Sequence, residues 1–194
     1  MRKPKLKEDI IMVIIISFLG FCFENIWMMF RYSVIDNRNM FLPFLLGYGL
    51  FVVAIYHFIG LPDKLFNKYK MSSPIKYVIY LFICFVLVSV GEILLGTFVE
   101  WIGNYYYWNY SSIPLHFTRY TSVPTSIGFA LVITLFMSFG FVPLLKSVRK
   151  KSKKLSVSLL LIFFLILVID MNVSFKQMKN NKGSNTIWAI NIKK

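Results

Sequence analysis

The sequence predicts an all-α polytopic membrane protein, a bundle of about five transmembrane helices, and three observations support this class. Hydrophobic residues make up 57% of the 194 residues and charged residues only 15%, whereas soluble domains carry about 25% charged residues. Apolar runs long enough for the roughly 17–25 residues that cross the hydrocarbon core recur along the chain. Lysines and arginines cluster between these runs.

Five spans follow from the hydropathy, at residues 10–30, 40–59, 77–100, 123–145 and 155–171. The first follows a basic N-terminus as a signal peptide would, but no small residues mark a cleavage site, so we expect an uncleaved span. The fifth is the shortest. Residues 1–171 therefore form the predicted transmembrane domain and residues 172–194 a polar C-terminal tail, in which 186–192 is a candidate short strand.

The basic residues predict the orientation of the chain. Fourteen lysines and arginines fall in the N-terminal segment and in the second and fourth connections, whereas the first and third connections hold three, Arg31, Arg38 and Arg119. Because short cytoplasmic loops carry such an excess, the N-terminus is expected in the cytoplasm and the tail, with five lysines, outside. The same clustering assigns the net charge of +14 to cytoplasmic loops, so no nucleic-acid partner is predicted.

No motif for a metal, a cofactor or a nucleophile occurs in the sequence. Cys22 and Cys84 both lie inside apolar runs, where small buried hydrophobic residues are expected rather than a disulfide. Patterns typical of zinc enzymes, P-loop ATPases and serine hydrolases are absent from the sequence. An ATP-driven role would therefore need a separate ATPase subunit.

Ionisable residues within the spans are informative, because each costs roughly 2.5–3.5 kcal/mol near the bilayer centre. They are Glu24, His57, Glu92, Glu100 and Asp170. At about 1.5 Å per residue, Glu24 and Glu92 lie roughly 9 and 12 Å below the outer ends of their spans, and so at a similar depth. Glu100 follows Glu92 by two i,i+4 steps and faces the same side of its helix.

An outward-facing pocket lined by Glu24, Glu92 and Arg38 is the functional hypothesis, since intramembrane acids are functional-site candidates by default. In the alternative interpretation these glutamates are neutral, or form hydrogen bonds that hold helices together.

Aromatic residues crowd the exit of the third span: Trp101, Tyr105, Tyr106, Tyr107, Trp108 and Tyr110. An interfacial belt at the membrane surface explains most of them. The segment "WNYSS" at 108–112 also offers hydrogen-bond donors and acceptors over an aromatic floor. A binding lip that includes Trp108, Tyr110 and Ser111 is therefore the alternative to a simple anchor.

Short motifs follow one another in a fixed order. They are "GxxxE" at Gly20 and Glu24, "NR…P…YG" at Asn37, Arg38, Pro43, Tyr48 and Gly49, the acids Glu92 and Glu100, and "WxYS" at Trp108, Tyr110 and Ser111. In this order they resemble the bacterial membrane family labelled putative ABC-transporter type IV, or ABC-transporter permease-like. The resemblance covers roughly residues 16–135, with the fifth span and the tail outside it.

The resemblance implies transport by a multi-pass protein of the bacterial cytoplasmic (plasma) membrane. Its matched polar residues fall on the side that the basic residues predict to be outside. This chain departs from the family pattern at two positions: Asn39 replaces the glycine of "NRG", and Asn109 replaces the aspartate of "WDYS". The second change removes an acid that could form an ion pair or carry a proton.

We therefore expect a permease-like protein that binds a small polar or amphiphilic solute, or a lipid headgroup, in an outer-half pocket. Its partners would be membrane lipids and a separate ATPase or other membrane protein subunit, with no cofactor, metal ligand or catalytic residue. The expected binding residues are Glu24, Asn37, Arg38, Tyr48, Glu92, Glu100, Trp108, Tyr110, Ser111 and Arg119.

Two alternatives remain open. One is an intramembrane enzyme acting on a lipid or isoprenoid substrate, with Glu92 or Glu24 as general acid or base. The other is an accessory or immunity-type membrane protein that acts by binding a partner in the bilayer.

Overall fold

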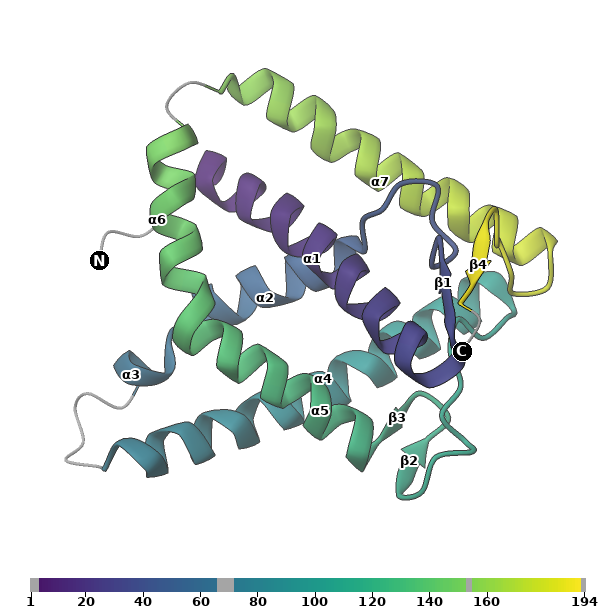
Figure 1. Ribbon diagram of the computed structural model, residues 1–194, viewed down its shortest axis with the longest axis horizontal. Helices are drawn as coiled ribbons and strands as arrows, with labels where there is room; N and C mark the ends of the chain where they lie inside the picture. Colours follow the sequence, from purple (N-terminus) through teal and green to yellow (C-terminus); the bar gives the residue numbers. More distant parts are fainter. Residues whose placement is uncertain (1–3, 66–71, 153–154, 193–194) are drawn as a thin grey trace. The chain divides into compact units, whose positions relative to one another are not determined.

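A computed structural model describes residues 4–65, 72–152 and 155–192 and confirms the all-α membrane class (Figure 1). Among these residues, five helices are long and apolar enough to cross a membrane: Leu6–Tyr32, Leu46–Leu65, Pro74–Gly103, Val123–Ser152 and Val157–Asn180. Of the basic residues that predict the orientation, Arg2, Lys3, Lys68, Lys70, Lys153 and Lys154 lie outside the described residues, as do Lys193 and Lys194 of the tail.

The chain divides into two compact units. Unit 1 comprises Met1–Ile55 and Leu144–Lys194, and unit 2 comprises Tyr56–Pro143. Unit 1 holds α1 (Leu6–Tyr32), β1 (Val34–Asp36), most of α2 (Leu46–Phe58), most of α6 (Phe141–Ser152), α7 (Val157–Asn180) and β4 (Ala189–Asn191). Unit 2 holds α3 (Pro62–Leu65), α4 (Ser73–Gly103), β2 (His116–Thr118), β3 (Thr121–Ser122), α5 (Val123–Leu135) and the π-helical turn η1 (Phe136–Gly140).

Helix α1 begins and ends with local capping interactions. The Glu8 carboxylate accepts a hydrogen bond from the Lys5 backbone N–H at 3.2 Å. It also forms an ion pair with Arg149 of α6 at 3.1 Å. The helix ends where Ser33 adopts a left-handed conformation (φ 55°) and donates its N–H to the Met29 carbonyl. These interactions fix both ends of α1 within unit 1.

Helix α2 makes a close contact with α1 because Gly49 has no side chain. A Cβ at Gly49 would lie 2.2 Å from the Val13 carbonyl oxygen and 2.4 Å from the Ser17 Oγ. The backbone of α2 therefore packs directly against α1. This approach explains the glycine of the "YG" motif.

The second span begins later than the expected residue 40, because residues 40–45 are not helical. Pro43 disfavours a helical conformation at the residue before it. The Asp170 carboxylate of α7 instead accepts hydrogen bonds from the backbone N–H groups of Phe41 and Leu42, at 3.2 and 3.4 Å. An acid in the fifth span thus caps this irregular segment.

The C-terminal residues are part of unit 1. Helix α7 runs to Asn180, beyond the expected limit of residue 171, because its polar last turns still form helical hydrogen bonds. Strand β4 then pairs antiparallel with β1, with Ile35 opposite Ile190 (Figure 1). The structure confirms a strand within residues 186–192.

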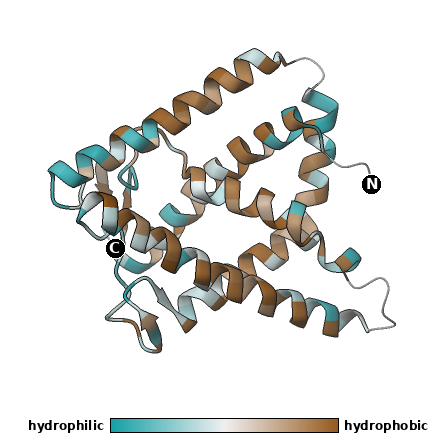
Figure 2. Cartoon of the chain, turned by 180° about the vertical axis from the view of Figure 1, so that it is seen from behind, coloured by the Kyte–Doolittle hydropathy of each residue, from teal (hydrophilic) through white to brown (hydrophobic). Residues whose placement is uncertain are grey.

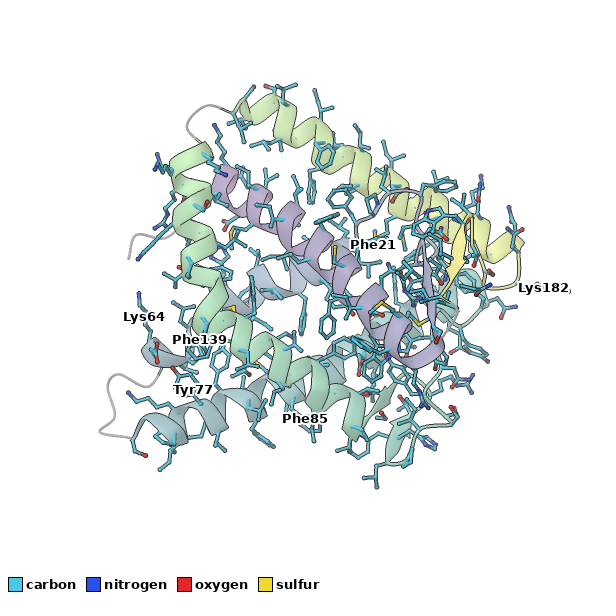
Figure 3. All side chains as sticks on the ribbon, viewed as in Figure 1. Phe21, Lys64, Tyr77, Phe85, Phe139 and Lys182 are labelled. Carbon is cyan, nitrogen blue, oxygen red and sulfur yellow. The ribbon has the colours of Figure 1, made fainter. Side chains whose placement is uncertain are left out.

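Unit 2 is built around α4, which is hydrophobic on every side. Large apolar side chains such as Phe82, Leu94 and Phe98 are exposed along it, and the spans are hydrophobic over most of their length (Figure 2). Such a helix suits a lipid surrounding. At its first turns the Tyr77 hydroxyl donates to Asp63 of α3 at 2.8 Å (Figure 3).

The connection from α4 to α5 positions the polar groups of unit 2. Helix α4 ends at Asn104, whose left-handed conformation (φ 54°) directs its N–H to the Glu100 carbonyl. Strands β2 and β3 form a short antiparallel hairpin, and the Ser122 hydroxyl caps α5 by accepting the Thr125 N–H.

Candidate functional site

The first polar cluster lies in unit 1 and is centred on Glu24 of α1. Tyr48 of α2 donates its hydroxyl to the Glu24 carboxylate. Gly20, one turn before Glu24, makes room for the tyrosine ring: a Cβ at Gly20 would lie 2.7 Å from the Tyr48 Cγ. The "GxxxE" motif therefore has a physical basis: the glycine leaves space for the Tyr48 ring, and the glutamate accepts a hydrogen bond from the Tyr48 hydroxyl.

Arg38 approaches Glu24 from a tight turn at residues 37–40. The Met40 N–H donates to the Asn37 carbonyl, and both central residues have positive φ, 46° at Arg38 and 61° at Asn39. Positive φ at both central positions is typical of a type I′ turn. The Arg38 guanidinium lies 3.9 Å from Glu24 and 3.3 Å from Asp36. Two carboxylates thus share one guanidinium.

This cluster is only partly shielded. The side chains of Glu24 and Arg38 are 20% and 23% exposed. The separation of 3.9 Å is at the outer limit for an ion pair, so this pair is loose.

Asn37 serves a structural role in the same turn. It is 2% exposed, its amide donates to the carbonyls of Met40 and Asn185, and its side-chain oxygen accepts the Ile187 N–H. Asn39 holds the tail as well, through two hydrogen bonds with Asn185. Asn37 therefore positions the turn, and its polar atoms face protein backbone.

The second cluster lies in unit 2 and is centred on Glu100 of α4. The Tyr120 hydroxyl donates to the Glu100 carboxylate, and Arg119 lies 3.6 Å from it. Gly96 lies one turn before Glu100, and a Cβ there would be 2.3 Å from the Tyr120 ring. A glycine, a tyrosine, an arginine and a glutamate meet here as they do in unit 1.

Aromatic groups support the second cluster. The Arg119 guanidinium lies over the Tyr106 ring at 4.6 Å, a cation–π distance. The Trp108 indole N–H donates to the Tyr120 carbonyl at 2.8 Å. Burial of the Tyr120 ring and its bond to Glu100 raise the pKa of Tyr120 to about 12, so its hydroxyl stays protonated near neutral pH.

The "WNYSS" segment forms a compact turn. The Asn109 side-chain oxygen accepts the Ser111 N–H at 2.9 Å, and the Tyr110 N–H donates to the Arg119 carbonyl at 2.7 Å. Ser111 itself is exposed, and Tyr110 is half-buried. This turn orders the loop that carries Arg119.

Glu92 has a different environment, two turns earlier on α4. Its carboxylate accepts hydrogen bonds from the Thr121 hydroxyl at 2.8 Å and from the Ser126 hydroxyl at 2.9 Å. Thr121 and Ser126 are fully buried. Glu92 thus joins α4 to the start of α5.

The expected binding residues divide between the two units. Glu24, Asn37, Arg38 and Tyr48 gather in unit 1, and the other six belong to unit 2. Glu24 and Glu92 were expected to share a pocket. Each has partners within its own unit. The shared pocket stays a prediction. No group of three or more His, Cys, Asp or Glu residues that could hold a metal ion occurs among the described residues.

Sequence reasoning missed five polar partners: Asp36, Tyr106, Tyr120, Thr121 and Ser126. The stretch "TSVPTS" at 121–126 concentrates hydroxyl groups immediately before an apolar run. That composition is the signal that could have identified the partners of Glu92. Tyr106 and Tyr120 could not be told apart from neighbouring aromatic residues.

The family model of the putative ABC-transporter type IV proteins matches residues 11–175. The chain belongs to this family. Comparisons with curated proteins and with solved structures found no match. The match confirms the resemblance seen in the sequence and corrects its limits: the family region does not stop near residue 135 but includes most of the fifth span. The protein is therefore a transporter-like, multi-pass membrane protein.

Both departures from the family pattern keep the local geometry. Asn39 has a φ of 61°, a left-handed conformation that glycine and asparagine adopt most readily. Asn109 accepts the Ser111 N–H through its side-chain oxygen, a bond that an aspartate can make equally well. The structural part of each motif is retained, while the negative charge of "WDYS" is lost.

Proposed function

We propose that this family member is a permease-like subunit that binds a small polar or amphiphilic solute, or a lipid headgroup, at the Glu24 cluster. The observation that carries the proposal is the loose, partly exposed ion pair between Glu24 and Arg38. It presents a carboxylate, a guanidinium and a phenol hydroxyl within one site.

This set of groups favours a ligand with both charges. An ammonium group would bind Glu24, and an anionic group would bind Arg38, so two intermolecular contacts would replace one loose internal pair. Asp36 adds a second carboxylate 3.3 Å from Arg38. The excess of acid over base favours ligands with a cationic part.

An intramembrane enzyme is the second candidate, because Ser126 and Thr121 donate hydrogen bonds to the Glu92 carboxylate as a nucleophile does to its base. Both hydroxyls are fully buried, which hinders access of a substrate to them. We therefore rank this reading below binding at Glu24.

The test is mass spectrometry of the small molecules and lipids that co-purify with the wild type, Glu24→Gln and Glu92→Gln. We expect a defined species in the wild type that is depleted at least about tenfold in Glu24→Gln. Glu8→Gln is the matched control, because it removes an ion pair of the same helix at its opposite end.

Each other outcome has a clear meaning. Loss only in Glu92→Gln, together with a modified lipid in the wild type, would support the enzyme. Bulk lipid alone, identical in all four proteins, would overturn the proposal and favour a protein partner.

A further inference from the structure

Two segments of the chain repeat the same pattern. One long helix of each unit carries "LGxxxE", at 19–24 in α1 and at 95–100 in α4. Each is followed by an arginine, and a proline lies five residues after that arginine, at Arg38 and Pro43 and at Arg119 and Pro124. The match continues as proline, two residues, an aliphatic residue, glycine, an aromatic residue and a small residue, at 43–49 and at 124–130.

The repeated residues play the same parts in three dimensions. In each unit the glycine of "LGxxxE" contacts a tyrosine ring, and the glutamate accepts that tyrosine's hydroxyl. In each unit the arginine approaches the same glutamate, at 3.9 Å in unit 1 and 3.6 Å in unit 2. In both units the glycine, the glutamate and the arginine of the cluster thus come from the same positions of the pattern.

The tyrosine is the informative exception. Tyr48 lies five residues after the proline of its segment, whereas Tyr120 lies four residues before the proline of its own. The position equivalent to Tyr48 is Phe129, which has no hydroxyl to donate. In both units a tyrosine hydroxyl therefore donates to the glutamate, although the two tyrosines occupy different positions of the repeated pattern.

We infer that the chain is a tandem duplication of a helix–loop–helix module, and that the Glu100–Arg119–Tyr120 cluster is a second binding site for the ligand class of the Glu24 cluster. This inference rests on the proposed function of the first cluster. The counterpart of Glu24 is then Glu100, whereas depth along the helix alone pairs Glu24 with Glu92.

The charges of the two clusters define the ligand class. Unit 1 has Glu24 and Asp36 around Arg38, whereas the position equivalent to Asp36 in unit 2 is Phe117. Arg119 is also more accessible than Arg38, at 44% against 23% exposed. The second site therefore takes a zwitterion that contacts Arg119 with a phosphate and Glu100 with an ammonium group.

A zwitterion of this kind can be a lipid headgroup or a free solute. The probes are dihexanoylphosphatidylethanolamine and phosphoethanolamine, each added to the full chain in detergent. Native mass spectrometry counts the bound molecules. Binding of both probes indicates recognition of the headgroup alone, and binding of the lipid only indicates that acyl chains contribute.

The expected stoichiometry is two molecules for the wild type, one for Glu24→Gln, one for Glu100→Gln and none for the double variant. Asp63→Asn is the matched control, because it alters a carboxylate of unit 2 that bonds to Tyr77 and lies outside the repeated pattern. Arg119→Gln is a second test that leaves the Glu100–Tyr120 bond in place, and it should weaken the unit 2 site at least about tenfold.

The outcomes separate the two proposals. One molecule in the wild type, lost in Glu24→Gln and kept in Glu100→Gln and Arg119→Gln, would overturn the second site and leave the proposed function standing. One molecule lost only in the unit 2 variants would overturn the proposed function at Glu24 and the equivalence of the sites. No binding of either probe, or two molecules in the double variant, would overturn both.

Discussion

Gly20 and Gly96 show, at the scale of single residues, how much the acidic clusters depend on an absent side chain. Each glycine lets a tyrosine ring lie against the helix backbone, which brings the phenol to a glutamate one turn later. The helix interior ordinarily disfavours glycine by about 1 kcal/mol relative to alanine. Here the close contact offsets that cost.

Gly96→Ala is expected to destabilise the protein by about 1–3 kcal/mol, because the new methyl group overlaps the Tyr120 ring. Gly128→Ala is the matched control: Gly128 lies in α5 and nothing lies within 4 Å of a Cβ placed there. Its stability should stay the same or rise by up to about 1 kcal/mol, because alanine favours a helix more than glycine does. Equilibrium unfolding in mixed detergent measures both, and equal effects of the two substitutions would refute the role assigned to Gly96.

Asp170 shows, at the scale of elements, how one helix shapes a distant loop. Its carboxylate accepts hydrogen bonds from the backbone N–H groups of Phe41 and Leu42. These two donors lie outside any helix and so have no helical hydrogen-bond acceptor. This contact holds the segment that leads from the Arg38 turn into α2. Within unit 1 these hydrogen bonds link the fifth span to the segment before α2.

Asp170→Ala should cost about 1–3 kcal/mol, because two backbone donors lose their acceptor. Asn172→Ala on the same helix removes an exposed bond to the Val168 carbonyl and should cost no more than about 0.5 kcal/mol. Thermal unfolding of the purified variants distinguishes them. A stable Asp170→Ala protein would show that water or lipid headgroups replace the carboxylate.

Hydropathy predicted the five spans but not the irregular segment at residues 40–45. An apolar run indicates that a segment can lie in the membrane, whereas its conformation here depends on Pro43 and on an acid 128 residues away. The early end assigned to the fifth span has a related cause. Hydropathy falls when α7 becomes polar, but its helical hydrogen bonds continue to Asn180.

At the scale of the whole molecule, the basic residues predict which ends of the helices face the cytoplasm. The loop between α4 and α5, which carries Arg119, is expected outside, and the basic end of α6 inside. The first connection, which carries Arg38, is expected outside as well.

Cysteine labelling of intact cells tests the orientation in a Cys22→Ser, Cys84→Ser background. A cysteine at Ser112 should react with a membrane-impermeant maleimide, because this exposed residue lies in the α4–α5 loop. A cysteine at Lys150 of α6, also exposed, should react only after permeabilisation. The reverse pattern would invert the predicted topology.

Most of the candidate site residues were identifiable from the sequence, but their grouping was not. Counting residues along helices paired Glu24 with Glu92 by depth. The contacts instead give Glu24 and Glu100 the same kinds of partner, a tyrosine hydroxyl and an arginine. Both arginines and Tyr120 come from connections whose path hydropathy does not describe. The repeated "LGxxxE" and arginine–proline spacing was the available signal for this grouping.

The bonds between the Arg38 turn and Asn185 have a consequence for biosynthesis. Asn37 and Asn39 bond to Asn185, which lies 148 and 146 residues later in the sequence and is therefore translated after them. Unit 2 is one continuous stretch, so its contacts can form while the ribosome is still adding residues. The bonds from Asn37 and Asn39 to Asn185 can form only after unit 2 has been synthesised, so we expect the Arg38 turn to be completed later than the contacts within unit 2.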